Sequence, residues 1–289
     1  MTTPSQSPIR NVSDTARWVA FYRAMESERP DAIFQDPYAR RLAGEQGEAI
    51  VNAMPKGKQF AWPMIVRTAV MDEIILREIA QDGVDCVLNL AAGLDARPWR
   101  LPLPASLFWV DVDLPVMLDH KEATLQGEKP RCRYEGVRLD LSNGTERRAL
   151  FRRIGSRAFR VLVITEGLLV YLSPGAVAEL ATDLHNEESF AFWLSDLASP
   201  GLLKMLARTW GSTLSAGNAP MQFAPADGTR FFGPYGWREK EYRAMFEESI
   251  RLKRTMPFAW FWRLIGRLHS KQKREEFKRF SGIVLFERA

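Results

Sequence analysis

The feature of this sequence that most constrains its fold is an apolar strand that ends at a lone glycine. Residues 84–90 are nearly all apolar, as expected for a parallel strand covered on both faces, and Gly93 follows them. A second strand-like stretch, 107–113, ends in carboxylates, and Asp113 lies twenty residues beyond the glycine. This spacing is typical of a Rossmann-type βαβ unit, in which the glycine lets backbone approach a ligand and the acid accepts hydrogen bonds from ribose hydroxyls.

The three-glycine pattern of dinucleotide-binding sites is absent from this turn. Gly93 stands alone and is followed by Asp95 and Arg97. Because the additional glycines serve to bring backbone close to a diphosphate, their absence favours an adenosyl cofactor without phosphate groups. We therefore expect S-adenosyl-L-methionine (SAM) rather than NAD, and a nicotinamide-dependent oxidoreductase is the disfavoured alternative.

Strand and helix patterns alternate along the rest of the chain, which favours a doubly wound parallel sheet. After the first strand, further strands are expected at about 108–112, 133–137, 161–165, 190–194 and 283–286. Apolar residues at helical spacing predict helices over 14–25 and 64–80. A third helix is expected over 174–186, with Ser173 as its N-cap and Pro174 in its first turn.

Several motifs resemble the leucine carboxyl methyltransferase family, most closely its bacterial branch of class I SAM-dependent O-methyltransferases. The similarity covers about residues 10–250, and the motifs that carry it are 14–20, 30–39, 91–102, 110–115 and 163–172. The resemblance implies an α/β fold with a Rossmann-like, doubly wound, mostly parallel seven-stranded sheet, whose closing strand at 283–286 is antiparallel. Residues 1–9 are expected to be a disordered tail and 10–289 one methyltransferase domain. Within that domain we expect an N-terminal helical cap at 10–80 and a lid-like insertion at 195–240.

Composition narrows the functional classes. No run of eighteen apolar residues is present, so a membrane span is not expected, and the polar first residues do not resemble a signal peptide. Cys86 and Cys132 show neither metal nor redox spacing, so no metal is expected and a reducing cytoplasm is the natural setting. Residues 251–279 contain ten Lys and Arg against two Glu, a local charge of +8, which leaves −3 for the rest of a chain of net +5. Because the basic character belongs to one segment, nucleic acid is not an expected partner and an RNA methyltransferase is the less favoured alternative.

Either aspartate of the second strand, Asp111 or Asp113, could accept hydrogen bonds from the ribose. The resemblance favours Asp113. The resemblance also implies that Asp140 and Leu141 contact the adenine. By composition alone, Asp140 fits a solvated turn nearly as well.

The methionine end of SAM is expected to meet charged groups. Glu166 follows the strand 161–165, where a carboxylate could hold the ammonium group, and its apolar neighbours predict a cationic partner for it. Arg67 matches the family arginine that binds the SAM carboxylate, a task that suits the forked guanidinium. A second family cation near the N-terminus is not assigned between Arg17 and Arg23.

No catalytic side chain is assigned, because the sulfonium already activates the methyl group and positioning can supply much of the acceleration. A carboxylate acceptor needs no general base, whereas a phenol or alcohol normally needs one, most often histidine. None of the three histidines, His120, His185 and His269, is placed at the carboxyl end of an expected strand. This scarcity favours a small organic acceptor methylated at a carboxylate to give a methyl ester. Methylation of a natural-product hydroxyl and a non-catalytic SAM-binding role are the alternatives.

Two aromatic segments have open interpretations. Phe231, Phe232, Tyr235 and Trp237 could line an acceptor site together with the N-terminal helices, or form the local core of the insertion. In the segment 256–280, aromatics lie beside cations and could contact an anionic membrane surface or guide an acidic, lipid-like substrate. We favour a structural role for this segment, because a strand follows it and must reach the sheet.

Overall fold

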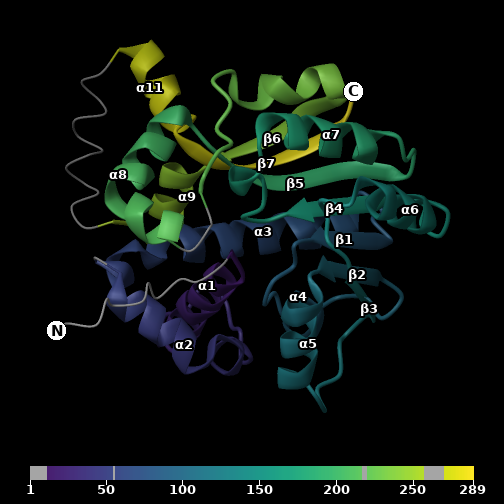
Figure 1. Cartoon of the computed structure of the whole chain (residues 1–289), viewed down its shortest axis with the longest axis horizontal. Helices are drawn as coiled ribbons and strands as arrows, with labels where there is room; N and C mark the ends of the chain where they lie inside the picture. Colours follow the sequence, from purple (N-terminus) through teal and green to yellow (C-terminus); the bar gives the residue numbers. More distant parts are fainter. Residues whose placement is uncertain (1–11, 55, 217–219, 257–269) are drawn as a thin grey trace.

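The computed structural model describes residues 12–54, 56–216, 220–256 and 270–289, and it contains one mixed sheet. The strand order is β3-β2-β1-β4-β5-β7-β6, with β1 to β5 parallel and β7 antiparallel to both of its neighbours. The predicted seven-stranded, mostly parallel, doubly wound sheet is therefore confirmed, including its antiparallel closing strand (Figure 1). The expected tail at 1–9 lies outside the described residues.

The element boundaries follow the predicted pattern closely. The strands are β1 (Cys86–Leu90), β2 (Phe108–Asp113), β3 (Arg133–Arg138), β4 (Val161–Thr165), β5 (Phe190–Ala198), β6 (Trp237–Ala244) and β7 (Ser281–Arg288). The helices before and between the parallel strands are α1 (Val12–Ser27), α2 (Ala39–Ala53), α3 (Ala61–Gln81), α4 (Arg97–Arg100), α5 (Pro115–Thr124), α6 (Gly144–Gly155) and α7 (Pro174–His185). The later helices are α8 (Pro200–Ala216), α9 (Met245–Arg251) and α11 (Lys271–Lys278), and short 3-10 turns lie at η1 (Gly57–Phe60), η2 (Leu169–Tyr171) and η3 (Gly228–Tyr235). The expected cap at the start of α7 is present, since the Ser173 hydroxyl accepts a hydrogen bond from the Ala176 amide.

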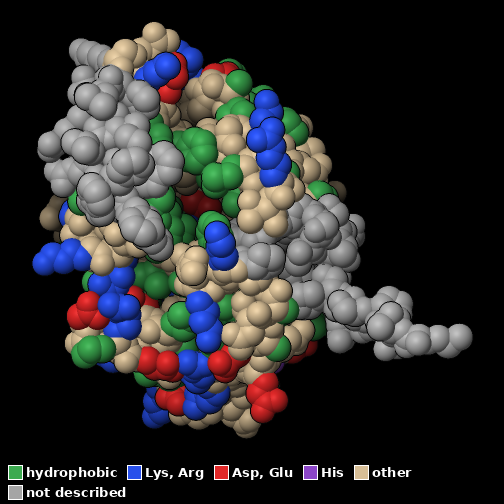
Figure 2. Space-filling model, turned by 90° about the vertical axis from the view of Figure 1, so that its left-hand side faces the viewer, with side chains coloured by type: hydrophobic (Ala, Val, Ile, Leu, Met, Phe, Trp, Pro, Cys, Tyr) green, Lys and Arg blue, Asp and Glu red, His purple; other side chains and the backbone are tan. Residues whose placement is uncertain are grey.

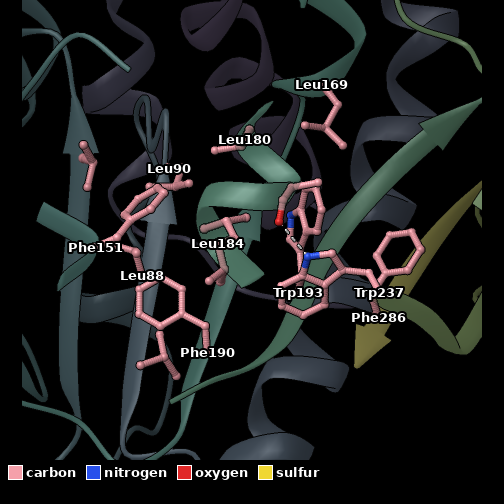
Figure 3. Close-up of a cluster of buried hydrophobic side chains, with 14 of the residues drawn as sticks. Leu88, Leu90, Phe151, Leu169, Leu180, Leu184, Phe190, Trp193, Trp237 and Phe286 are labelled. Carbon is pink, nitrogen blue, oxygen red and sulfur yellow. Dashed lines mark hydrogen bonds between the residues drawn. The ribbon is translucent and has the colours of Figure 1, made fainter. Parts of the chain in front are cut away.

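Each face of the sheet is covered by its own hydrophobic core, because successive side chains of a buried strand point to opposite faces. In β4, Val161 and Val163 pack with α6 and α7, whereas Leu162 and Ile164 pack against α3. The core on the α6 and α7 face includes a group of aromatic rings around Trp193 (Figure 3). The indole N–H of Trp193 donates to the Thr165 hydroxyl. This double cover explains why the parallel strands are continuous apolar runs in the sequence.

A third core joins the N-terminal helices to one end of the sheet. Trp18 and Phe21 of α1 pack with Leu42 of α2 and with Leu94 and Trp99, which follow β1. Figure 1 shows α1 and α2 beside α3, and α8, α9 and α11 gathered at the end of the sheet toward which β4 points. No helix in the described parts of the chain is both long and apolar enough to cross a membrane.

The segment 195–240 is more regular than a simple insertion. It contains the end of β5, all of α8 and η3, and the start of β6. The sequence patterns did not locate α8, η3 or β6. Trp237 and Phe232 are fully buried in the core around Trp193, and Phe231 and Tyr235 pack against that core. These four aromatics therefore belong to a hydrophobic core and not to the cavity lining, but this core is the one on the α6 and α7 face of the sheet and not a local core of the insertion.

Candidate active site

One large cavity of about 1270 Å³ opens where the parallel strands end. Its lining includes all six residues predicted to bind the cofactor: Arg67, Gly93, Asp113, Asp140, Leu141 and Glu166. They come from α3 and from the ends of β1, β2, β3 and β4, which meet at one edge of the sheet. Figure 2 shows this face of the molecule, with a hollow that has hydrophobic walls and an acidic floor. Open α/β sheets bind their ligands at this edge.

The turn after β1 is built around backbone that only a few residue types adopt readily. Gly93 has φ +51°, and a Cβ there would lie 3.2 Å from the Cβ of Ala16 in α1. Ala91 also has a positive φ, +52°, a costly conformation for a residue with a side chain that is concentrated at functional sites. The Gly93 amide donates to Asp113 Oδ2 at 2.6 Å, which links the turn directly to the end of β2.

The two aspartates of β2 have different environments. Asp111 is fully buried, accepts a 2.6 Å hydrogen bond from the equally buried Lys121, and does not line the cavity. Asp113 lines the cavity, and its carboxylate accepts from the amides of Gly93 and Leu114 at 2.6 and 2.7 Å. A carboxylate has about four lone-pair positions, so Asp113 retains acceptor capacity for a ligand. Burial raises the pKa of Asp113, and the two amides oppose that shift.

Arg67 and Glu166 face each other across the cavity floor. Arg67 Nε donates to Glu166 Oε1 at 2.9 Å, and Arg67 Nη1 donates to Asp196 Oδ2 at 3.2 Å. The expected cationic partner of Glu166 is therefore present. Gly167, with φ +64°, makes room for this arginine, because a Cβ there would lie 3.2 Å from Arg67 Nη1. Asp196, at the end of β5, also accepts from the Gly167 amide at 2.6 Å, and sequence reasoning did not identify it as a site residue.

A second arginine reinforces the carboxylate of Glu166. Arg97 is almost fully buried, and it donates to Glu166 Oε2 at 2.8 Å, to Asp95 at 2.7 Å and to Asp72 at 2.6 Å. Burial alone would raise the pKa of Glu166, but Arg97 and Arg67 outweigh it and hold the pKa below its usual value. No sequence pattern predicted the role of Arg97.

These contacts extend into a continuous set of paired charges that we call the charge network. Arg100 donates to Asp72, Arg23 donates to Asp36, and Asn89 bridges Asp95 and Asp111. Within the described ranges, the network consists of Arg23, Asp36, Arg67, Asp72, Asp95, Arg97, Arg100, Asp111, Lys121, Glu166 and Asp196. It has one more carboxylate than cations, and Asp113 beside it adds another.

The end of β3 contributes the polar rim. Asp140 is exposed, and its carboxylate accepts from the Ser142 amide at 2.9 Å, so the turn interpretation describes its local contacts. The Leu141 carbonyl accepts from Arg147 at 2.8 Å, which holds the loop against α6. Both residues nevertheless line the cavity.

The other cations, histidines and aromatics considered for the site differ in whether they line the cavity. Arg23 lines the cavity but is engaged by Asp36 and the Leu94 carbonyl, whereas Arg17 contacts His120 outside the cavity lining. His120 and His185 do not line the cavity either, and His269 lies outside the described residues. The aromatics of 257–269 also lie outside the described residues, although Phe277 and Phe280 that follow them do line the cavity.

Comparison with known proteins agrees with this geometry. The family model described as leucine carboxyl methyltransferase matches residues 16–185. A Parafrankia protein that carries the name of a SAM-dependent methyltransferase is 32% identical over 85% of this chain and 83% of its own length. A Streptomyces coelicolor protein with the same kind of name is 30% identical over 84% of this chain and 88% of its own.

Solved structures share the fold at low identity. A DUF574 family protein from Streptomyces avermitilis has a TM-score of 0.61 at 13% identity and covers 95% of this chain and 97% of its own. A protein from Thermobifida fusca that carries the name of a methyltransferase has a TM-score of 0.55 at 13% identity, covering 97% and 96%. Sheet order, strand-end cavity and relatives together define the class of this protein, which is a SAM-dependent methyltransferase. More narrowly, the chain belongs to the leucine carboxyl methyltransferase family.

Proposed function

We propose that this methyltransferase binds SAM in the central cavity and transfers its methyl group to the oxygen of a small organic carboxylate, giving a methyl ester. Asp113 would accept from the ribose hydroxyls, with Gly93 allowing close approach of the backbone. Asp140 and Leu141 would contact the adenine. Arg67 would hold the SAM carboxylate, and Glu166 would accept from its ammonium group.

The charge distribution of the site fits this cofactor. SAM carries a sulfonium, an ammonium and a carboxylate, so its net charge is positive, and the charge network with Asp113 has an excess of carboxylates. Arg67 uses Nε and Nη1 for Glu166 and Asp196, so in the described structure Nη2 has hydrogens available for a ligand carboxylate. Charge-assisted hydrogen bonds of this kind are about twice as strong as neutral ones.

The reaction needs orientation more than proton transfer. SAM supplies an electrophilic methyl group, whose bond to sulfur breaks as the acceptor oxygen donates an electron pair to carbon. When the acceptor is a carboxylate, its negative charge and the sulfonium charge cancel, and no proton has to move. The chain's part is to align the two reactants and exclude water, which can be worth an effective molarity of roughly 10⁵ M or more.

One observation carries the choice of a carboxylate. Among the histidines that the structure describes, neither lines the cavity, so neither is placed to take the proton that a phenol or alcohol must lose. Hydroxyl methylation of a natural product is the second candidate, and it requires a base other than these histidines.

The bond type of the product tests this proposal. The protein is incubated with methyl-labelled SAM and a panel of carboxylic acids and phenols, and the labelled product is then treated with mild alkali. A methyl ester releases labelled methanol, as we expect. A labelled product that survives alkali would instead identify an ether and refute the carboxylate assignment.

We also propose that residues 10–80 act as a cap and that 195–240 acts as a lid over the acceptor. Support comes from Trp18 of α1, Met64 of α3 and Leu206 of α8, which line the cavity away from the strand ends. Because helices outside the sheet form this wall, they can differ between relatives without disturbing the cofactor end.

A further inference from the structure

The cavity is larger than a single cofactor needs. Sites for a drug-sized ligand generally occupy about 300–1,000 Å³, and this cavity has about 1270 Å³. Its polar lining is concentrated at the strand ends, whereas α1, α3, α8, α9 and α11 contribute mainly apolar side chains. The apolar part is therefore available for a second molecule beside the cofactor.

Methionine is frequent in the lining of this cavity. Six of the chain's ten methionines line the cavity: Met64, Met117, Met205, Met221, Met245 and Met256. Methionine is unbranched and polarisable, so a wall built from it adapts to apolar ligands of irregular or variable shape. Aromatic side chains from α3, α9 and α11 complete the wall, among them Trp62, Phe246 and Phe277.

We propose that the acceptor is a carboxylic acid with a long or bulky apolar body, which lies in this methionine-rich chamber while its carboxylate reaches the cofactor. This proposal rests on the proposed methyl transfer and specifies its acceptor. A small hydrophilic acid would leave the apolar wall in contact with water, whereas an apolar chain displaces that water and gains affinity in proportion to the area it buries. A second charge at the far end of such a chain would lose its hydration against the apolar wall, which costs free energy.

Binding of straight-chain acids tests the proposal without requiring turnover. The protein is first saturated with S-adenosylhomocysteine, and hexanoate, octanoate, decanoate and dodecanoate are then titrated in by calorimetry. We expect the affinity to rise roughly threefold to fourfold for each added methylene. Dodecanedioate has the same length with a second carboxylate, and it should bind at least tenfold more weakly than dodecanoate. An affinity independent of chain length, or equal binding of the two C12 acids, would overturn the proposal.

A paired set of variants locates the effect. Met205 and Leu206 of α8 both line the cavity and are not fully buried, so the double variant M205Q/L206Q is expected to fold. It should flatten the dependence on chain length. The matched control is A207Q, which introduces the same side chain at the next position of α8, where the exposed residue does not line the cavity. Equal behaviour of the double variant and the control would place the acids elsewhere and contradict the assignment.

The design separates this inference from the proposed function. If S-adenosylhomocysteine does not bind, the cofactor site itself is wrong. If it binds and the separate assay with methyl-labelled SAM gives an ether formed on apolar alcohols, the carboxylate assignment fails. If it binds and small polar acids are the better ligands, only the apolar acceptor is refuted.

Discussion

Replacing Asp113 by alanine tests the cofactor site most directly. The change removes the carboxylate that would accept from the ribose, and it also removes the acceptor of the Gly93 and Leu114 amides. The Leu114 amide lies at an exposed position where water can replace the lost partner. The Gly93 turn, however, loses the contact that fixes it to the end of β2. Both effects weaken SAM binding.

The magnitude follows from the hydrogen bonds concerned. A hydrogen bond to a charged group contributes about 1.5–3 kcal/mol, which corresponds to roughly 10- to 150-fold in affinity. We therefore expect D113A to raise the dissociation constant for SAM by a factor in this range. D113N retains one oxygen that can accept from the Gly93 amide, so it should fall between the parent and D113A.

Calorimetric titration of SAM measures these constants, and circular dichroism verifies that each variant is folded. The control is D119A, which removes the same charge from an exposed position of α5 that does not line the cavity. It should bind SAM like the parent. If D113A also binds within twofold of the parent, the ribose does not lie at Asp113 and the cofactor placement must be abandoned.

Four further outcomes are expected. G93V should weaken SAM binding at least tenfold in the same titration, since valine is strained at φ +51° and crowds the turn; unchanged binding would contradict the close approach of backbone. D111N should destabilise the fold by about 3–5 kcal/mol in urea unfolding because it leaves the buried Lys121 without an opposite charge, and D111N/K121M should recover most of this loss; no recovery would mean that the pair is not the cause. Because the folded pKa of Glu166 is lowered, its contribution to stability is complete above its unfolded pKa and is lost as pH falls through the lower folded value; E166Q should flatten this acid dependence of the melting temperature, and an unchanged profile would refute it. G167A should lower SAM affinity by displacing Arg67, and parent-like affinity would show that the guanidinium does not depend on this glycine.

The parallel strands could be predicted because their signal is local. A strand covered on both faces is an apolar run, and β1 and β4 are fully buried along their length. The strand that the patterns missed, β6, has the sequence WREKEYRA and lies at the edge of the sheet. Charged side chains on an edge strand protect it from pairing with other molecules, and they also remove the apolar alternation by which a strand is identified.

Local sequence could not decide either which of the two aspartates in β2 faces the ligand. Asp111 and Asp113 are two residues apart, so both point to the same face of the strand. What separates them is Lys121, one helix later, which pairs with Asp111 and leaves Asp113 at the cavity. Strand periodicity alone does not predict which of the two aspartates pairs with a cation.

The charge network marks the limit of sequence reasoning at this site. The cost of burying Glu166 correctly predicted a cationic partner. Sequence could not identify the partners, because Arg67 and Arg97 lie 99 and 69 positions away from Glu166. Without the family resemblance, Arg67 has the pattern of an ordinary surface charge on a helix, because helix periodicity does not tell which polar residue the tertiary fold will bury. The same packing makes the arginine structural as well as ligand-binding: removing it leaves Glu166 and Asp196 short of a partner in a partly buried site. Loss of SAM binding on changing Arg67 therefore has meaning only when the unfolding free energy is measured with it. The Asp113 carboxylate accepts from backbone amides, so changing Asp113 reports on the cofactor more directly.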